Sequence, residues 1–434
     1  MKNLLLFSLL SSLIGCNKPD DQILSDANGV ATRLPHLWKS SISQDGGLSA
    51  SMAAQHIYNN RYLLTAQREP QSTSIPLPTN LCFKRLEDGK DVWVWKDRFR
   101  TNETSATFNY GIYANQDLLL YNYGPRSYCI NQQTGQTVWK KEWTPGISNI
   151  ITTKGLGDHF YFTGTPPALY NQKRFEESIY QGDMATGAIR EIAKLAVLPG
   201  KIWRDPSGYD EWSLGRRISV FVRRADTLLL VSYDLPDPRP AFTTTSSGYL
   251  SLYNLTQQKW VYEQKPMINQ QEAGGGNHPN IIGDKVYYAI NMWIGCFDLM
   301  TGERVWMKRI TEASLFSHMI VAEGKLLANG QDAKLYCLDP QTGNTLWTQR
   351  SSGIGSSLHY QDGVVYYIAS QNLLATEVAT GKLLWNLDCP DYYTISRGDS
   401  WFSGFVTGLS GTGGKKGRIF ASTNLNVYSF EAAK

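Results

Sequence analysis

The chain has 434 residues, of which 42% are hydrophobic and 18% are charged, and its formal net charge is +4. A disordered chain would be richer in charge and poorer in apolar residues, and a nucleic-acid-binding domain would carry a dense stripe of Lys and Arg. The composition therefore predicts a folded protein without a nucleic-acid partner, and the 12% share of aromatic residues favours strands over helices.

The first sixteen residues have the pattern of an export signal. A short basic start precedes a mostly apolar run from Leu4 to Ile14, which is too short to span a bilayer. The run ends in Leu13-Ile14-Gly15-Cys16, which resembles the bacterial lipoprotein box, in which the Cys becomes the lipidated N-terminus. We therefore predict a lipoprotein signal peptide at residues 1–15, a lipidated tether at 16–33 and one folded domain at 34–434.

The predicted anchor implies a place in the cell. Asn17 follows Cys16, whereas an Asp at that position would resemble an inner-membrane retention signal in bacteria with two membranes. No other stretch reaches the ~18 apolar residues of a membrane-spanning helix. We therefore expect a lipid-anchored protein of the bacterial cell envelope, held at the outer membrane on its periplasmic face or at the cell surface.

The rest of the chain repeats one short pattern. A small residue is followed two positions later by a polar residue, then by Thr-Gly, and four positions after the Gly by a Trp. Four copies are unambiguous: Cys129–Trp139, Cys296–Trp306, Cys337–Trp347 and Ala375–Trp385. Alternating apolar residues on both sides of a glycine turn predict a β-hairpin in each copy.

Weaker copies extend the pattern to eight units. The copies that begin at Cys82, Gln181 and Leu252 lack part of the motif, and the last unit, from Ile419, has no Trp strand of its own. Such a strand is present at Trp38, at the other end of the domain. Units of ~40–50 residues with four strands each predict a propeller. We therefore predict an all-β fold, an eight-bladed β-propeller of four-stranded antiparallel blades, whose ring is closed by an N-terminal strand in the last blade.

The repeat assigns a structural role to a set of Trp residues and leaves one wide interval. The Trp residues expected at the repeat position are Trp38, Trp93, Trp139, Trp260, Trp306, Trp347 and Trp385. The widest interval, 191–260, leaves room for an insertion. Within it, the polar stretch Trp203–Arg217 and the Pro-rich stretch Asp234–Pro240 are predicted loops.

Five Cys residues remain besides Cys16. Four of them occupy one repeat position: Cys82, Cys129, Cys296 and Cys337. Equivalent positions lie a blade apart, which is farther than a disulfide can reach. We therefore predict small buried core residues, and no spacing typical of a zinc site occurs. Cys389 stands outside the repeat.

The repeat resembles that of the PQQ-like, or quinoprotein-type, propeller family, which lies in the wider WD40-like and quinoprotein-like superfamily. The resemblance covers essentially the whole predicted domain and implies that each Trp packs on the turn of a neighbouring blade. One branch is non-enzymatic and includes the propeller lipoprotein of the outer-membrane β-barrel assembly machinery, which is similar in length, lipobox and blade count. The quinoprotein dehydrogenases of the other branch are longer and carry a vicinal Cys pair that this sequence lacks.

This resemblance implies a non-enzymatic, membrane-anchored envelope lipoprotein that acts as a protein-binding scaffold in outer-membrane protein assembly or a related complex. We expect no cofactor, a monomer, and as partners the membrane through Cys16 and other envelope proteins. Two alternatives stay open. One is an oxidoreductase relative that binds pyrroloquinoline quinone (PQQ) and calcium. The other is a propeller that binds carbohydrate or another small ligand through aromatic side chains outside the repeat: Trp203, Trp212 and Trp401.

A candidate ligand site follows from the register of three units. His278, His318 and Ser357 each stand six residues before the turn residue of their unit, which places them at the start of an inner strand. Together with Asn277, from the Gly-rich stretch before His278, they would line the central channel. Two His without a third ligand do not make a metal site, and a solvated channel lining explains the same residues more simply. The sequence thus predicts no catalytic, cofactor-binding or metal-binding residue.

Overall fold

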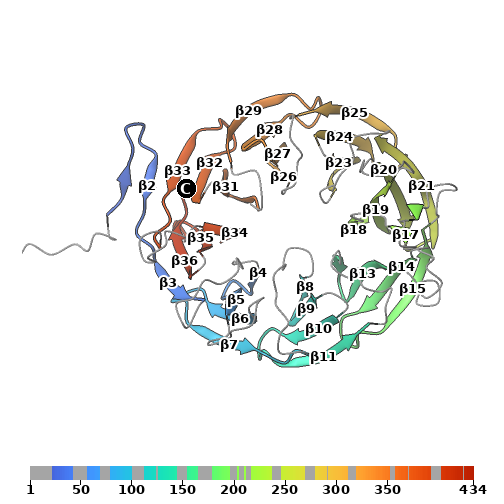
Figure 1. Cartoon of the computed structure of the whole chain (residues 1–434), viewed down its shortest axis with the longest axis horizontal. Helices are drawn as coiled ribbons and strands as arrows, with labels where there is room; N and C mark the ends of the chain where they lie inside the picture. The colour runs from blue at the N-terminus through green and yellow to red at the C-terminus, as the bar shows by residue number, and fades with distance from the viewer. Residues whose placement is uncertain are drawn as a thin grey trace, which may run out of the picture.

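The computed structural model of the chain contains only β-strands and connecting segments in the residues that it describes. Those residues are 22–42, 56–68, 79–99, 112–123, 126–143, 154–164, 178–195, 203–204, 210–211, 217–236, 246–268, 279–290, 292–310, 319–351, 357–369, 371–391, 402–423 and 425–434. The strands form a ring of sheets around a common axis (Figure 1). Within this part of the chain, no helix has the length and hydropathy needed to cross a membrane.

The ring consists of eight four-stranded antiparallel blades, as predicted. The first four blades are blade 1, β4 (His56–Tyr58), β5 (Tyr62–Arg68), β6 (Thr79–Arg85) and β7 (Asp91–Trp95); blade 2, β8 (Ile112–Asn115), β9 (Leu118–Tyr123), β10 (Arg126–Asn131) and β11 (Thr137–Glu142); blade 3, β12 (Lys154–Leu156), β13 (His159–Gly164), β14 (Ser178–Asp183) and β15 (Ile189–Lys194); and blade 4, β18 (Arg217–Arg223), β19 (Asp226–Pro236), β20 (Ser246–Asn254) and β21 (Lys259–Ile268). In each blade the first strand lies nearest the axis and the last lies at the rim (Figure 1).

The other four blades repeat this order. They are blade 5, β22 (Asn280–Ile282), β23 (Lys285–Ile290), β24 (Trp293–Asp298) and β25 (Arg304–Arg309); blade 6, β26 (Met319–Ala322), β27 (Lys325–Gly330), β28 (Lys334–Leu338) and β29 (Thr345–Arg350); blade 7, β30 (His359–Gln361), β31 (Val364–Ala369), β32 (Asn372–Glu377) and β33 (Leu383–Leu387); and blade 8, β34 (Phe402–Leu409), β35 (Arg418–Thr423), β36 (Asn426–Glu431) and β3 (Trp38–Ser41). Blade 8 thus joins both ends of the domain.

The ring closes through the N-terminal strand β3. This strand pairs antiparallel with β36 and places Trp38 opposite Ser429. Lys84 of blade 1 secures it, because its buried Nζ donates to Ser40 Oγ over 2.8 Å and forms an ion pair with Asp91 at 2.5 Å. The predicted closure is therefore confirmed.

A second N-terminal element lies outside blade 7. The strands β1 (Leu24–Ser25) and β2 (Ala31–Arg33) form a hairpin, and β2 lies parallel to β33 with Ala31 beside Trp385. Blade 7 thereby becomes part of a six-stranded sheet whose outermost strand is β1. Residues 24–33, which the sequence analysis placed in the tether, thus pack on the rim of the ring.

Five of the repeat Trp side chains dock on the turn of the next blade. Trp306 is representative, because its Nε1 donates to the Pro340 carbonyl over 3.0 Å and a Cβ on Gly343 would lie 2.7 Å from its ring. The same pair of contacts is made by Trp38 at Gly89, Trp93 at Gly135, Trp139 at Gly187 and Trp347 at Gly381. Each turn needs Gly both for its positive φ and for the room that the indole occupies.

Blade 4 departs from the predicted register. Tyr262, not Trp260, lies against the turn glycine of the next blade, Gly302. Tyr262 stands opposite Leu252, whereas Trp260 stands opposite Tyr253 and packs on residues of blades 3 and 4. The assignment of Trp260 to the docking position is therefore wrong, because the ten-residue spacing from Cys296 to its partner Trp306 leads from Leu252 to Tyr262 and not to Trp260.

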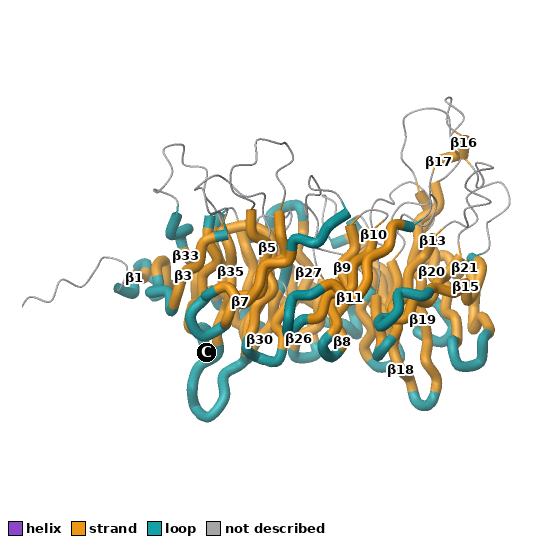
Figure 2. Tube along the Cα trace, turned by 90° about the horizontal axis from the view of Figure 1, so that it is seen from below, coloured by secondary structure: helices purple, strands orange, loops and turns teal. Residues whose placement is uncertain are grey.

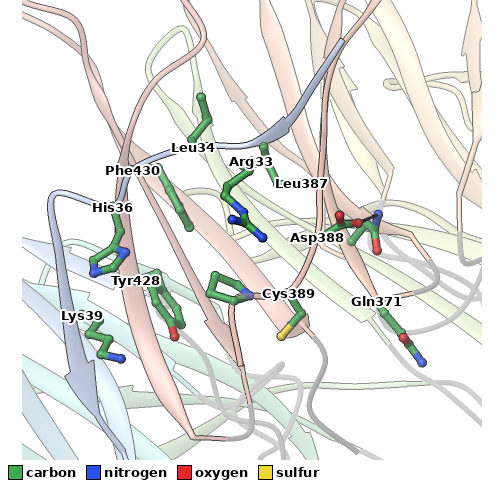
Figure 3. A pocket seen from close by; sticks show the side chains of 12 residues that line it. Arg33, Leu34, His36, Lys39, Gln371, Leu387, Asp388, Cys389, Tyr428 and Phe430 are labelled. Atoms are coloured by element: carbon green, nitrogen blue, oxygen red, sulfur yellow. Dashed lines mark hydrogen bonds between the residues drawn. The ribbon is translucent and has the colours of Figure 1, made fainter. Parts of the chain in front are cut away.

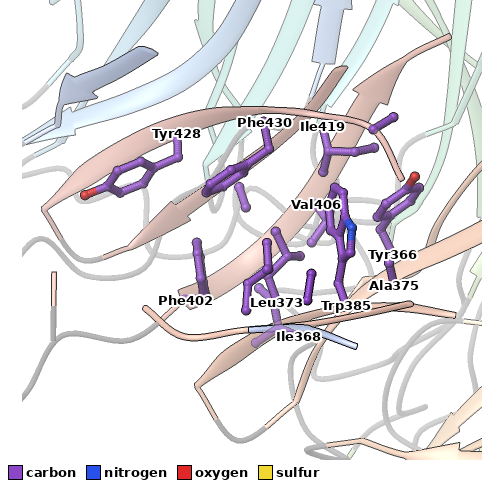
Figure 4. Packing of buried hydrophobic residues seen from close by; sticks show 14 of the residues in the cluster. Tyr366, Ile368, Leu373, Ala375, Trp385, Phe402, Val406, Ile419, Tyr428 and Phe430 are labelled. Atoms are coloured by element: carbon purple, nitrogen blue, oxygen red, sulfur yellow. The ribbon is translucent and has the colours of Figure 1, made fainter. Parts of the chain in front are cut away.

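Trp385 has a different neighbour from the other repeat Trp residues. Blade 8 has no turn between its third strand β36 and its rim strand, since β3 comes from the N-terminal part of the domain. Trp385 is instead buried in a cluster shared by blades 7 and 8 (Figure 4), to which Ala31 of the hairpin, paired with Trp385, also belongs. Its ring meets Tyr366 edge-on at 5.3 Å.

The middle strands of the blades carry the core. All six residues of β31, Val364–Ala369, are buried, because each face of the strand packs against another blade. Strands covered on both faces need continuous apolar runs, whereas the rim strand β29 alternates between exposed and half-buried residues. The hydrophobic core is therefore distributed as layers between blades.

The 191–260 interval holds the insertion in part as a short hairpin. Its strands, β16 (Trp203–Arg204) and β17 (Asp210–Glu211), pair antiparallel and lie beyond the blades on one face of the ring (Figure 2). The stretch from Asp234 to Pro236 was predicted as loop but forms the end of β19. Proline is accommodated there because it stands at the last position of the strand, opposite Ser246.

Candidate functional site: the strap cleft

The structure describes one of the four predicted channel residues. Asn277, His278 and His318 lie outside the described residues, as do Cys16, Trp212 and Trp401. Ser357 is buried, and its Oγ accepts a hydrogen bond from the Val406 backbone N–H of blade 8 over 3.0 Å. The described role of Ser357 is therefore to join blades 7 and 8.

Two other histidines occupy inner strands. His56 Nε2 lies 3.0 Å from Gln132 Oε1 of blade 2, and His359 Nε2 lies 3.3 Å from Gln361 Oε1. Burial lowers the pKa of both imidazoles, although each hydrogen bond opposes this shift. These side chains are thus held neutral and serve contacts near the axis. Among the described residues, no three His, Cys, Asp or Glu side chains are grouped as metal ligands.

The five described Cys residues are buried and have free thiols. Burial raises the pKa of Cys129 and Cys337 to about 12, which disfavours the reactive thiolate. Both therefore behave as small core residues, as do Cys82 and Cys296 at the same repeat position.

A cleft with a volume of about 370 Å³ lies between blades 7 and 8. The segment Arg33–Lys39, which we call the strap, runs over it from the hairpin to the closing strand (Figure 3). We call this cavity the strap cleft. Its lining residues are Arg33, Leu34, His36, Lys39, Gln371, Asn372, Leu387, Asp388, Cys389, Pro390, Tyr428 and Phe430.

The walls of the strap cleft differ in charge. Arg33 and Lys39 of the strap are exposed, and neither has an acidic partner in the described part of the chain. Opposite them, Asp388 accepts a hydrogen bond from Asn372 Nδ2 over 3.1 Å. The backbone N–H of Asp388 donates to the Thr32 carbonyl over 3.0 Å. The cleft therefore offers two free cations and one neighbouring carboxylate.

The floor of the strap cleft is aromatic and firmly held. Tyr428 and Phe430 stack with ring centroids 5.9 Å apart, and His36 meets Tyr428 edge-on at 5.5 Å. Tyr428 Oη donates to the buried Asp391 over 2.6 Å, and Asn426 Nδ2 donates to the same carboxylate. Both rings are almost fully buried in the core of blades 7 and 8, so the floor is rigid and would not reorganise when a group binds in the cleft.

Sequence reasoning missed the strap cleft. Its residues come from both ends of the chain, and no local motif marks Asp391, which lies between repeat units. The split blade could have predicted the strap cleft, because the closing strand β3 must bring the residues that precede it over blades 7 and 8.

A smaller groove of about 150 Å³ lies between blades 3 and 4. Its lining includes Glu191, which holds the sequence position of the missing Trp, together with Leu255 and Gln258 of the next blade. The docking turn of blade 4 also lacks Gly. The groove is therefore a structural consequence of the degenerate repeat, and its lining contains no aromatic side chain.

Known proteins resemble the chain in sequence pattern and in fold. A family model described as "Outer membrane protein assembly factor BamB" matches residues 291–413, from β24 of blade 5 into blade 8. No curated protein matches the chain significantly. The match covers a little over a quarter of the chain and includes the blade 7 wall of the strap cleft.

Solved structures share the ring at low sequence identity. A quinohemoprotein alcohol dehydrogenase from Pseudomonas putida HK5 aligns with a TM-score of 0.60 and 11% identity, over 92% of this chain and 76% of that protein. A europium-containing methanol dehydrogenase aligns at 0.59 and 12%, over 89% and 84%. The computationally designed Ika8 protein aligns at 0.56 and 10%, over 90% and 99%. These likenesses concern the fold.

Proposed function

We propose that this PQQ-like propeller, which resembles the outer membrane protein assembly factors, is a non-enzymatic scaffold that binds other envelope proteins. The observation that carries the proposal is the family-model match over residues 291–413, since that model describes an assembly factor. The proposed protein acts as a monomer, binds no nucleic acid and needs no cofactor. Its mechanism is recognition on a rigid, closed ring.

The strap cleft is the proposed contact for a protein partner. Its two exposed cations, Arg33 and Lys39, which have no acidic partner among the described residues, suit an extended polypeptide segment with acidic side chains. Because Tyr428 is held by Asp391, the partner would bind a preformed surface and lose little free energy to ordering it.

The proposed location is the outer membrane of a bacterium, with the chain anchored through a lipid on Cys16. Support comes from the position of Cys16 at the end of the apolar N-terminal run and from the description of the matching family model.

Site-specific photo-crosslinking in intact envelopes tests the scaffold. A photoreactive residue replaces Gln371, which lines the strap cleft, and a matched one replaces Gln258, which lines the groove between blades 3 and 4. Adducts with outer-membrane proteins are expected at position 371 and not at 258. Identical adducts at both positions, or none at 371, would contradict the proposal.

Charge reversal provides a second test of partner binding at the strap cleft. Lys39→Glu is expected to reduce the adduct at position 371 several-fold, whereas Lys259→Glu, which changes an exposed lysine on the rim of blade 4, should leave it unchanged.

A titration with PQQ and Ca²⁺, followed by quenching of Trp emission, tests the enzyme alternative. Saturable quenching would replace the scaffold with a quinoprotein.

A further inference from the structure

The N-terminal hairpin and the strap carry exposed apolar side chains. Nine large hydrophobic side chains are exposed in the described part of the chain, and three of them lie within its first eighteen residues: Ile23, Leu24 and Leu37. Ile23 is the most exposed of the nine, at 64%. The exposed aliphatics of the rim strands, such as Val138 and Leu346, stand singly, one to a blade.

The hairpin is fixed to the ring. Ala31 bridges to Trp385, and the Thr32 carbonyl accepts the Asp388 N–H over 3.0 Å. Within the hairpin, the Asp26 side chain accepts the N–H groups of Asn28 and Val30 and closes the turn. β1 is the outermost strand, with no further layer over it in the described structure (Figure 1, Figure 2). Ile23 and Leu24 therefore have a fixed position at the rim of blade 7.

Chain length limits how far this position can be from a membrane. Seven residue steps separate Cys16 from Ile23, and even a fully extended chain spans at most about 24 Å over that length. If Cys16 carries the lipid, as the proposed function holds, the rim of blade 7 must therefore stay close to the bilayer surface. Transfer of an exposed aliphatic pair from water into the headgroup boundary lowers the free energy.

We propose that the hairpin β1–β2 is a membrane contact, in which Ile23 and Leu24 enter the lipid interface and hold the rim of blade 7 against the bilayer. This inference rests on the lipid anchor of the proposed function. It gives the ring a defined orientation, with blades 3 and 4 on the far side from the membrane (Figure 1).

The contact is apolar in character. Between residues 17 and 39 the basic and acidic side chains balance: Lys18, Arg33 and Lys39 against Asp20, Asp21 and Asp26. Electrostatic attraction to anionic lipid therefore adds little, and the contact should form equally on zwitterionic and anionic bilayers and persist at high salt.

Photo-crosslinking to lipid tests the contact in the full-length protein. A photoreactive residue is placed at position 23 or, as a control, at position 222, where Val222 of blade 4 is similarly exposed, at 59%. After irradiation of native membranes, the protein is digested, and mass spectrometry of the peptides detects phospholipid adducts and acyl chains on the Cys16 peptide. Several-fold more phospholipid adduct at position 23 than at 222 supports the inference.

Every other outcome overturns it in a distinguishable way. An acylated Cys16 with no excess of lipid adduct at position 23 overturns the membrane contact alone. Protein adducts at position 23 in place of lipid ones assign the hairpin to a protein partner. A Cys16 peptide without acyl chains overturns the proposed lipid anchor, and it also overturns the membrane contact, which depends on that anchor.

Discussion

Gly343 and Gly324 lie in the same blade and share a φ of +68°, but their surroundings differ. A Cβ at Gly343 would lie 2.7 Å from the Trp306 ring, whereas a Cβ at Gly324 would meet nothing within 4 Å. Gly324→Ala should therefore cost only the left-handed backbone strain, about 1–2 kcal/mol. Gly343→Ala should cost at least twice as much, because the indole must also move. Urea unfolding of the two variants compares them, and equal losses would show that the indole contact adds nothing.

Tyr262 and Tyr428 are both buried but differ in what their hydroxyls do. Tyr428 Oη donates to Asp391, whereas no described residue accepts a hydrogen bond from Tyr262 Oη. Tyr428→Phe should therefore destabilise the fold by about 1–3 kcal/mol, while Tyr262→Phe should be neutral or slightly stabilising. Thermal and urea unfolding give the measurement. A clear loss of stability in Tyr262→Phe would mean that its hydroxyl has a partner.

At the scale of the element, the inner strands β4 and β30 make stability depend on pH. Burial lowers the pKa of His56 and His359 below the 6.5 of the free side chain, so the unfolded chain binds more protons between the two values. The contribution of these two neutral histidines to the free energy of unfolding is complete above about pH 6.5. It is lost as the pH falls from there toward the lowered pKa of the folded state. The urea midpoint should therefore fall between pH 7.5 and pH 5.5.

His56→Gln and His359→Gln provide the check on this assignment. Each substitution should flatten the pH dependence of the midpoint, because a neutral amide takes up no proton. The turn carboxylates of Asp298 and Asp339 stay ionised in this range, since hydrogen bonds lower their pKa below the ordinary value. An unchanged slope in both variants would assign the pH dependence to other groups.

The elements also show which strands and contacts the sequence pattern could predict. The Thr-Gly turn and its Trp predict the third and fourth strands of a blade because one local pattern sets both the turn and the docking contact. In blade 4 the residue type misleads, because Tyr262 and not Trp260 keeps the ten-residue spacing from the small residue of the motif and makes the docking contact. The strap cleft could not be predicted, since Arg33 and Tyr428 meet through ring closure and not through local sequence.

At the scale of the whole molecule, the two N-terminal elements have separable roles. The hairpin covers the rim of blade 7, while β3 completes blade 8 and contacts blade 1 through Trp38 and Lys84. A chain that begins at residue 34 should therefore keep the closed ring and unfold in one transition, with a modest loss from uncovering Trp385. A chain that begins at residue 43 loses the closing strand as well.

The second truncation should lose several kcal/mol more than the first. Removal of a buried Trp alone costs about 3–5 kcal/mol, and the edge of β36 and the Nζ of Lys84 both lose their partners. An open ring has free ends from which blades can unfold separately, so its urea transition should broaden and its radius of gyration should rise. Urea titration of Trp emission and small-angle scattering provide both readings. If the two truncated chains unfold at the same midpoint with the same radius, the N-terminal strand does not hold the ring closed.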